Sequence, residues 1–179
     1  MNYSADQIQE KAKEARAAIV LAIHFAGSGH PGGSLSIIDT ELALYLNVLK
    51  HDPKNPFWEE RDRLFVSGQH KCPAQYAAMG IAGYYPLKDF IVGLRVVGTT
   101  FQGHPDWAKL PGIEMSGGSL GQGLGIAVGS ALAAKLDNKP YRVYCIMGDG
   151  EQQEGSIWEA AMSASHYKLD NLCAIVDIN

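Results

Sequence analysis

Apolar residues recur at helical spacing along the first part of the chain. Ser4, followed three residues later by Gln7, has the spacing of an N-terminal capping box, and the apolar periodicity continues from there to Ala26. Gly27-Ser28-Gly29 then interrupts it with residues that favour a turn. The pattern therefore predicts one long helix that begins after Ser4 and ends at the glycines.

Shorter elements are predicted between residues 30 and 110. A second helix is expected from about Ser36, with Asp39 in its first turn and apolar residues continuing to Leu49. A turn-rich break, a short buried strand and two further helical stretches are then expected over residues 52–56, 64–67, 73–81 and 87–95.

The second half of the chain alternates helices and strands. The predicted elements are a helix over 120–136, a buried strand over 141–147, a helix over about 155–167 and a strand over 172–177. A strand–helix–strand order of this length is a βαβ unit, which places its two strands parallel in one sheet. We therefore predict an α/β fold, with a parallel sheet and helices on both faces, over residues 1–179 as a single domain.

Glycines interrupt the predicted helix over 120–136 in a regular way. Gly121, Gly125 and Gly129 recur at every fourth position. Glycine costs a helix roughly 1 kcal/mol per residue relative to alanine. We therefore expect something to approach this glycine face closely.

Composition and charge narrow the classes of function. A net charge of −4 and a pI near 5.8 argue against a nucleic-acid-binding protein, which usually needs a basic face. The first residues do not form a basic segment followed by an apolar run, so no secretory signal is expected. The most apolar stretch, residues 17–23, is too short to cross a bilayer. We expect a cytoplasmic protein that binds neither nucleic acid nor membranes.

The three cysteines lie far apart and form no Cys-x-x-Cys pair. Cys145 and Cys173 fall in runs that are predicted to be buried strands, and Cys72 follows the predicted strand over 64–67. Their odd number and their placement indicate reduced thiols in the core of a cytosolic protein.

Two polar residues directly follow predicted strands. Asp149 comes after the strand over 141–147, and Asn179 after the strand over 172–177. Because parallel strands end at the same edge of a sheet, this carboxylate and amide can converge, and Mg²⁺ accepts a few such oxygens together with phosphate and water. Gly148 and Gly150 allow the backbone to pass close to a diphosphate. The alternative is that Gly148-Asp149-Gly150 is an ordinary turn.

Gly148-Asp149-Gly150, followed some thirty residues later by Asn179, resembles the thiamine-diphosphate signature. The resemblance implies that Asp149 and Asn179 hold the Mg²⁺ (or Ca²⁺) that binds the cofactor's diphosphate, with Gly150 beside it. Decarboxylases, dehydrogenases and synthases share this signature. It therefore implies the cofactor, not the reaction.

Three histidines lie beside glycine or proline in predicted loops. Their segments are Ser28-Gly29-His30-Pro31-Gly32-Gly33, Ser67-Gly68-Gln69-His70 and Gly103-His104-Pro105-Asp106. A single loop histidine is more often an incidental surface residue, but three such segments ahead of Gly148-Asp149-Gly150 resemble the transketolase pattern. That resemblance implies that His30 and His104 contact sugar hydroxyls and the carbonyl near the reacting carbon, and that His70 lies by the diphosphate. A neutral imidazole can donate or accept a proton near pH 7.

Further positions are carried over from the same resemblance. The segment Ser116-Gly117-Gly118-Ser119-Leu120-Gly121-Gln122-Gly123 is similar to the family's segment beside the cofactor rings, which implies that Gly118 and Leu120 contact the cofactor. The alternative is a glycine-rich helix start that allows close packing. Glu154 matches a glutamate near the family's subunit interface, linked to the partner active site. For Glu159 a solvated helix face is at least as good an interpretation.

The resemblance extends from about residue 10 to residue 179. It implies a thiamine-diphosphate-binding fold, shortened here, in the N-terminal subunit of a split transketolase. The glutamate that activates the aminopyrimidine ring belongs to a second domain, so a complementary C-terminal subunit with the pyrimidine domain is expected, in a hetero- and homo-oligomer. Together the subunits would transfer a two-carbon ketol unit from a ketose phosphate to an aldose phosphate, as in the pentose phosphate pathway.

One segment departs from the family pattern, and other functions compete. Gln69-His70-Lys71-Cys72 replaces the usual Gly-His followed by small residues, so Lys71 is expected to alter the diphosphate pocket. Other thiamine-diphosphate enzymes, such as a deoxyxylulose-phosphate synthase or a 2-oxoacid dehydrogenase E1 subunit, lack the histidine segments at 29–33 and 103–106. A truncated, non-catalytic fragment is a second alternative. A nicotinamide-binding domain is a third alternative. Against it, no Gly-x-Gly-x-x-Gly directly follows the first strand of a βαβ unit.

Overall fold

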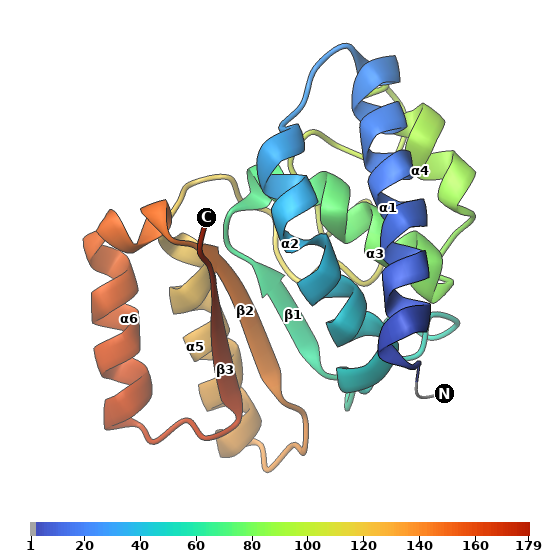
Figure 1. The fold of residues 1–179 in the computed structure, drawn as a ribbon. Helices are drawn as coiled ribbons and strands as arrows, with labels where there is room; N and C mark the ends of the chain where they lie inside the picture. The colour runs from blue at the N-terminus through green and yellow to red at the C-terminus, as the bar shows by residue number, and fades with distance from the viewer. Residues whose placement is uncertain (1–2) are drawn as a thin grey trace.

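The computed structural model describes residues 3–179 as six α-helices around a three-stranded sheet (Figure 1). The helices are α1 (Ala5–Ala26), α2 (Pro31–Ala43), α3 (Cys72–Ala82), α4 (Leu87–Gly93), α5 (Gln122–Leu136) and α6 (Gly155–His166). The strands are β1 (Arg63–Val66), β2 (Val143–Gly148) and β3 (Leu172–Asp177). A π-helical turn (Leu44–Val48) prolongs α2, and 3₁₀ turns (Gln69–Lys71 and Gly150–Gln153) precede α3 and α6.

The sheet is parallel and has helices on both faces, as predicted. Its strand order is β1-β2-β3, with Val66 opposite Ile146 and Gly148 opposite Asp177. Figure 1 shows α1 to α4 on one side of the sheet and α5 and α6 on the other. Leu64 and Val66 pack into the core on the first side, whereas Phe65 packs into the core on the second. The alternation of side chains along a strand therefore gives each face its own hydrophobic core.

The prediction of the first helix is correct, and that of the start of the second is not. Ser4 and Gln7 form the predicted capping box, and Gly27 ends α1 in the left-handed region with φ 64°. The second helix begins at Pro31, ahead of the expected Ser36. Proline at the first helical position needs no N–H partner and has a suitable φ, so the His30-Pro31 segment, which suggested a loop, opens α2 instead.

The glycine face of α5 also differs from the prediction. A Cβ on Gly123 would lie 2.4 Å from the Ser67 side chain, but a Cβ on Gly125 or Gly129 would meet nothing within 4 Å among the described residues. The packed face of α5 instead includes Gly123, Ala127 and Ala131. Of the three glycines on the predicted face, Gly121 is closely approached, since a Cβ there would lie 2.6 Å from the Ser156 Oγ, whereas nothing within residues 3–179 approaches Gly125 or Gly129.

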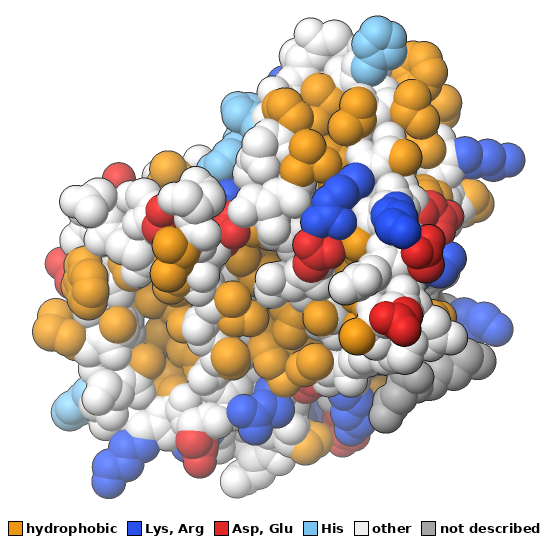
Figure 2. Space-filling view, in the orientation of Figure 1, with side chains coloured by type: hydrophobic (Ala, Val, Ile, Leu, Met, Phe, Trp, Pro, Cys, Tyr) orange, Lys and Arg blue, Asp and Glu red, His pale blue; other side chains and the backbone are white. Residues whose placement is uncertain are grey.

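The strand β3 is more exposed than predicted. Among the described residues it is paired on one side only, to β2, and Cys173 is half-buried, unlike Cys72 and Cys145. Between β3 and α6 the surface is hollowed by an apolar groove that includes Leu172 and Ala174, and hydrophobic side chains gather on this face (Figure 2). All three cysteines are free thiols, and burial raises the pKa of Cys72 to about 12.

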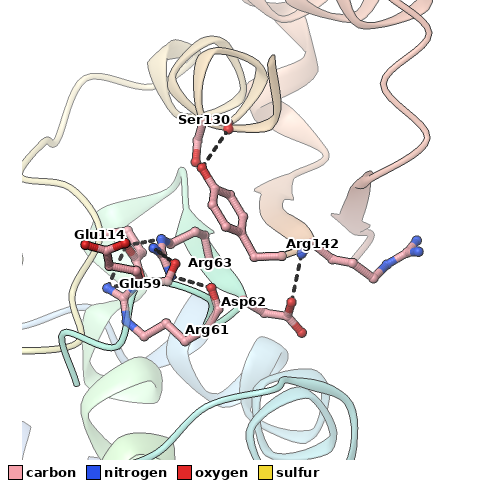
Figure 3. Close-up of polar contacts among 8 residues, drawn as sticks. Glu59, Arg61, Asp62, Arg63, Glu114, Ser130 and Arg142 are labelled. Carbon is pink, nitrogen blue, oxygen red and sulfur yellow. Dashed lines mark hydrogen bonds and ion pairs between the residues drawn. The ribbon is translucent and has the colours of Figure 1, made fainter. Parts of the chain in front are cut away.

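Charged residues fix the amino edge of the sheet (Figure 3). Asp62 accepts a hydrogen bond from the backbone N–H of Arg142 at 2.8 Å, which joins the starts of β1 and β2. Glu114 forms ion pairs with Arg61 at 2.9 Å and Arg63 at 3.7 Å. Within residues 3–179, no helix combines the length and the apolar character needed to cross a membrane. The charged contacts of Asp62 and Glu114 hold the amino edge of the sheet together. The loops at the opposite, carboxyl edge are therefore where a functional site is expected.

Candidate functional site

A cavity of about 330 Å³ opens at the carboxyl edge of the sheet. Five residues predicted from the sequence line it: His70, Leu120, Asp149, Gly150 and Asn179. The other four lining residues are Gly33, Lys71, Gly148 and Glu151, of which Gly148 and Lys71 were also expected from the sequence to lie near the diphosphate. The cavity thus joins the start of α2 with the loops that follow all three strands.

The ends of β2 and β3 hold Asp149 and Asn179 at neighbouring positions. The backbone N–H of Asp149 donates to the carbonyl of Asp177 at 3.0 Å, which continues the strand pairing beyond Gly148. The Asp149 carboxylate accepts from the N–H of Gly150 at 2.8 Å. The sequence-derived prediction that these two strand ends meet at one cavity agrees with this geometry.

The donor set fits a metal that is shared with a phosphate ligand. Among residues 3–179, no group of three or more His, Cys, Asp or Glu side chains is placed to hold a metal by itself. Asp149 and Asn179 offer one carboxylate and one amide oxygen, and Mg²⁺ commonly combines one or two such groups with phosphate oxygens and water. A Cβ on Gly150 would meet nothing within 4 Å, so this side of the cavity stays open to a ligand.

Glu151 links three loops beneath this cavity. Its side chain is buried, and its carboxylate accepts hydrogen bonds from the hydroxyl of Ser67, from the N–H of Gly121 at 2.7 Å and from the N–H of Gly148 at 3.2 Å. Ser67 in turn accepts from the N–H of Gly123 at 3.1 Å. Sequence reasoning missed Glu151, because an acidic residue after a glycine turn suggests only a favourable helix start.

Lys71 reaches into the cavity and pairs with Asp177. The two side chains are 2.5 Å apart, and Asp177 also accepts from the Ser36 hydroxyl at 2.7 Å. Burial alone would raise the pKa of Asp177, but the hydrogen bonds from Lys71 and Ser36 and the Lys71 charge outweigh it, so this pKa is lowered. The expected departure at Lys71 thus lies at the cavity itself.

The three predicted histidines lie close together beside the cavity. The ring centroids of His30 and His70 are 5.5 Å apart, and a Cβ on Gly118 would lie 3.3 Å from the ring of His104. Histidine side chains gather next to the carboxyl edge in Figure 2. His70 lines the cavity, whereas His30 and His104 are exposed and lie outside its lining.

Two of these imidazoles have lowered pKa values. Burial lowers the pKa of His70 first, and the nearby charges of His30 and Lys71 lower it further. Burial also lowers the pKa of His104, with additional contributions from Arg95 and His30. Both rings are therefore neutral near pH 7, the form that can exchange a proton.

Gln69 positions the glycine-rich segment. Its side-chain amide donates to the carbonyl of Met115 at 2.9 Å, and Gly117 packs against it, since a Cβ there would lie 3.2 Å from the Gln69 oxygen. Gly118, with φ 151°, then passes the ring of His104. Gln69, which departs from the family pattern, therefore holds the loop that contains Gly118, the residue predicted to contact the cofactor rings.

The predicted glutamates lie outside this cavity. Glu154 precedes α6, is exposed, and packs beside Gly121, where a Cβ would lie 2.7 Å from the Glu154 Cβ. Glu159 is exposed on α6. Gly118 is not part of the cavity lining either.

Comparison with known proteins decides the family. The sequence pattern of the family described as transketolase, thiamine diphosphate binding domain, matches residues 8–179. The chain belongs to this family. A 6-deoxy-6-sulfo-D-fructose transketolase subunit of Clostridium is 46% identical over 172 residues, which cover 96% of the chain and 62% of the relative. An apulose-4-phosphate transketolase subunit of Phocaeicola vulgatus is 40% identical over 97% of the chain and 61% of its own length.

Solved transketolase structures agree with the fold. The transketolase from Leishmania mexicana superposes with a TM-score of 0.89 at 33% identity, over 100% of the chain and 28% of the transketolase. The transketolase from Campylobacter jejuni gives 0.88 at 37% identity, over 99% and 29%. The chain therefore spans less than two thirds of the split relatives and less than a third of these whole transketolases.

Proposed function

We propose that residues 1–179 act as the diphosphate-binding unit of a split transketolase. A complementary subunit with the pyrimidine domain would complete the active site, in a cytoplasmic hetero- and homo-oligomer. The assembled enzyme would transfer a two-carbon ketol unit from a ketose phosphate to an aldose phosphate, the reaction type of the pentose phosphate pathway. The observation that carries the proposal is the convergence of Asp149 and Asn179 on one cavity.

Each part of the site receives a role in this proposal. Asp149 and Asn179 hold Mg²⁺ (or Ca²⁺), while Gly150 and His70 lie against the diphosphate. Gly118 and Leu120 contact the cofactor rings, and Glu154 faces the subunit interface. When bound, thiamine diphosphate supplies the electron sink for cleavage beside a carbonyl.

The histidines handle protons on the sugar. Ketol transfer requires a hydroxyl to lose a proton and a carbonyl oxygen to gain one, and a group with a pKa close to the working pH does this best. His104 is neutral near pH 7 because its pKa is lowered, so it can accept a proton. His30 begins α2 at the same side of the cavity and can hydrogen-bond the other sugar oxygens.

Relatives suggest the kind of substrate. The two split relatives are named for 6-deoxy-6-sulfo-D-fructose and for apulose 4-phosphate, which are both sugars with an anionic group. We therefore propose an anionic sugar, with a sugar phosphate as the first choice.

Calorimetry tests the cofactor site directly. Thiamine diphosphate is titrated into the protein with and without Mg²⁺, and with and without the complementary subunit. Binding should require Mg²⁺ and be lost in Asp149→Ala, whereas Asp137→Ala, an exposed aspartate beyond the end of α5, should bind normally. Ketol transfer should appear only with the partner. No binding with the partner and Mg²⁺ present would contradict the proposal and leave a chain that folds without binding cofactor.

A further inference from the structure

We propose that Lys71 is a direct ligand of the cofactor's diphosphate. This inference rests on the proposed function of the cavity. It adds a residue that lies outside the metal-binding signature and at the position where this chain departs from the family pattern.

The fold directs the Lys71 side chain into the cavity. The residue is 5% exposed and follows His70 in the 3₁₀ turn after β1. A Cβ on Gly33 would lie 2.9 Å from the Lys71 Cγ, and a Cβ on Gly148 would lie 3.6 Å from its Nζ. The aliphatic stem therefore passes the first turn of α2, and the ammonium group lies beside the end of β2.

The Lys71 ammonium group can donate further hydrogen bonds. A lysine carries three N–H donors. Within residues 3–179, Lys71 uses its ammonium group for a single partner, the carboxylate of Asp177. Its remaining N–H groups are therefore available to oxygens of a ligand in the cavity.

The charges of the cavity favour the same assignment. The lining contains the carboxylates of Asp149 and Glu151, and Lys71 is the only lysine or arginine among the lining residues. A diphosphate adds further negative charge to this site. A fixed cation beside Gly148 offsets that repulsion together with the metal, and ammonium–phosphate hydrogen bonds are strong because both groups are charged.

A structural role for Lys71 makes a different prediction. If Lys71 served only to neutralise Asp177 and hold the loop with Asn179, removing both charges together would restore binding. Raising the Mg²⁺ concentration would also restore it, because the loss would lie in the affinity for the metal. A direct contact to the diphosphate is restored by neither.

The test measures thiamine diphosphate affinity by calorimetry at two Mg²⁺ concentrations, one that just saturates the wild type and one well above it, with the full chain assembled with its complementary subunit. We expect Lys71→Met and the double variant Lys71→Met/Asp177→Asn to weaken binding by about 10- to 100-fold. Lys71→Arg, which keeps the charge and the donors, should retain most of the affinity. Lys88→Met, an equal change of charge on the exposed surface of α4, should bind as the wild type does.

Each outcome is decisive. Wild-type affinity in the double variant, or recovery of Lys71→Met at high Mg²⁺, would overturn the direct contact. If Lys71→Met alone fails to fold, as judged by circular dichroism, the double variant and Lys71→Arg still decide the question. If the wild type itself does not bind the cofactor, the proposed function fails. Normal wild-type binding with an unaffected Lys71→Met overturns only this inference.

Discussion

The buried carboxylate of Glu151 accepts a hydrogen bond from the backbone N–H of Gly121 at 2.7 Å, across thirty positions of sequence. The contact joins the turn after β2 to the start of α5. With the bonds from Ser67 and Gly148, one side chain fixes the three loops at the cavity on the carboxyl edge of the sheet. The shape of the cavity therefore depends on a residue that also forms part of its lining.

Truncation of Glu151 should destabilise the fold. Glu151→Ala leaves the Ser67 hydroxyl and two backbone N–H groups without their buried acceptor, and we expect a loss of about 2–4 kcal/mol in the free energy of unfolding. Urea denaturation measures it. Glu60→Ala, the same change at an exposed position, should lie within about 0.5 kcal/mol of the wild type. Equal stability of the two variants would show that Glu151 does not fix these loops.

Two glycines of α5 should respond in opposite directions to the same substitution. Gly123→Ala places a methyl group 2.4 Å from Ser67 and should cost about 1–3 kcal/mol through overpacking. Gly125→Ala adds a methyl group in open space and should stabilise the helix by up to about 1 kcal/mol. Thermal unfolding of both variants at several protein concentrations is the measurement. If Gly125→Ala instead destabilises the protein in a concentration-dependent way, another chain packs against this face.

Glu41 should make stability fall as the pH rises. Its carboxylate is fully buried, and neither oxygen has a hydrogen-bond partner among residues 3–179. Burial raises the pKa of Glu41 well above its ordinary value, although Lys71 lowers it in part. The folded state binds this proton more tightly than the unfolded state. Its stabilising effect is complete below the unfolded pKa of about 4.5 and is lost as the pH rises through the folded value.

Replacing Glu41 tests this dependence. Glu41→Met keeps a similar volume without the unpartnered oxygens, and it should stabilise the protein at pH 8 by about 1–3 kcal/mol, with a smaller gain at pH 5. Urea denaturation at both pH values gives the difference, and Glu60→Met is the exposed control. A gain that does not change with pH would mean that Glu41 does not titrate between pH 5 and pH 8.

Arg95 should tune the pKa of one histidine more than that of another. Its side chain packs against Gly103 and bonds Ser28 at 3.1 Å, and its charge helps to lower the pKa of His104. Arg95→Met should therefore raise the pKa of His104 and change that of His70 much less, since burial, His30 and Lys71 lower the latter more than His104 does. Ring-proton titration by NMR follows both. A parallel shift of the two histidines would indicate a general rearrangement.

Elements that depend on local pattern could be predicted from the amino-acid sequence alone. The capping box at Ser4, the helix to Ala26 and the strand–helix–strand order of the second half follow from side-chain periodicity and turn residues. The same reasoning predicted that Asp149 and Asn179 lie at one edge of the sheet, because the parallel strands of a βαβ unit end at the same edge.

Contacts across long separations in sequence depend on the three-dimensional arrangement. The assignment of Glu151 as an acceptor, the pairing of Lys71 with Asp177 and the choice of Gly123 over Gly125 as the packed glycine depend on how α2, α5 and the strands are placed in space. No local periodicity encodes these contacts, since each joins segments that are distant in sequence, and a rotation of one helix by a single residue changes which side chain faces the sheet.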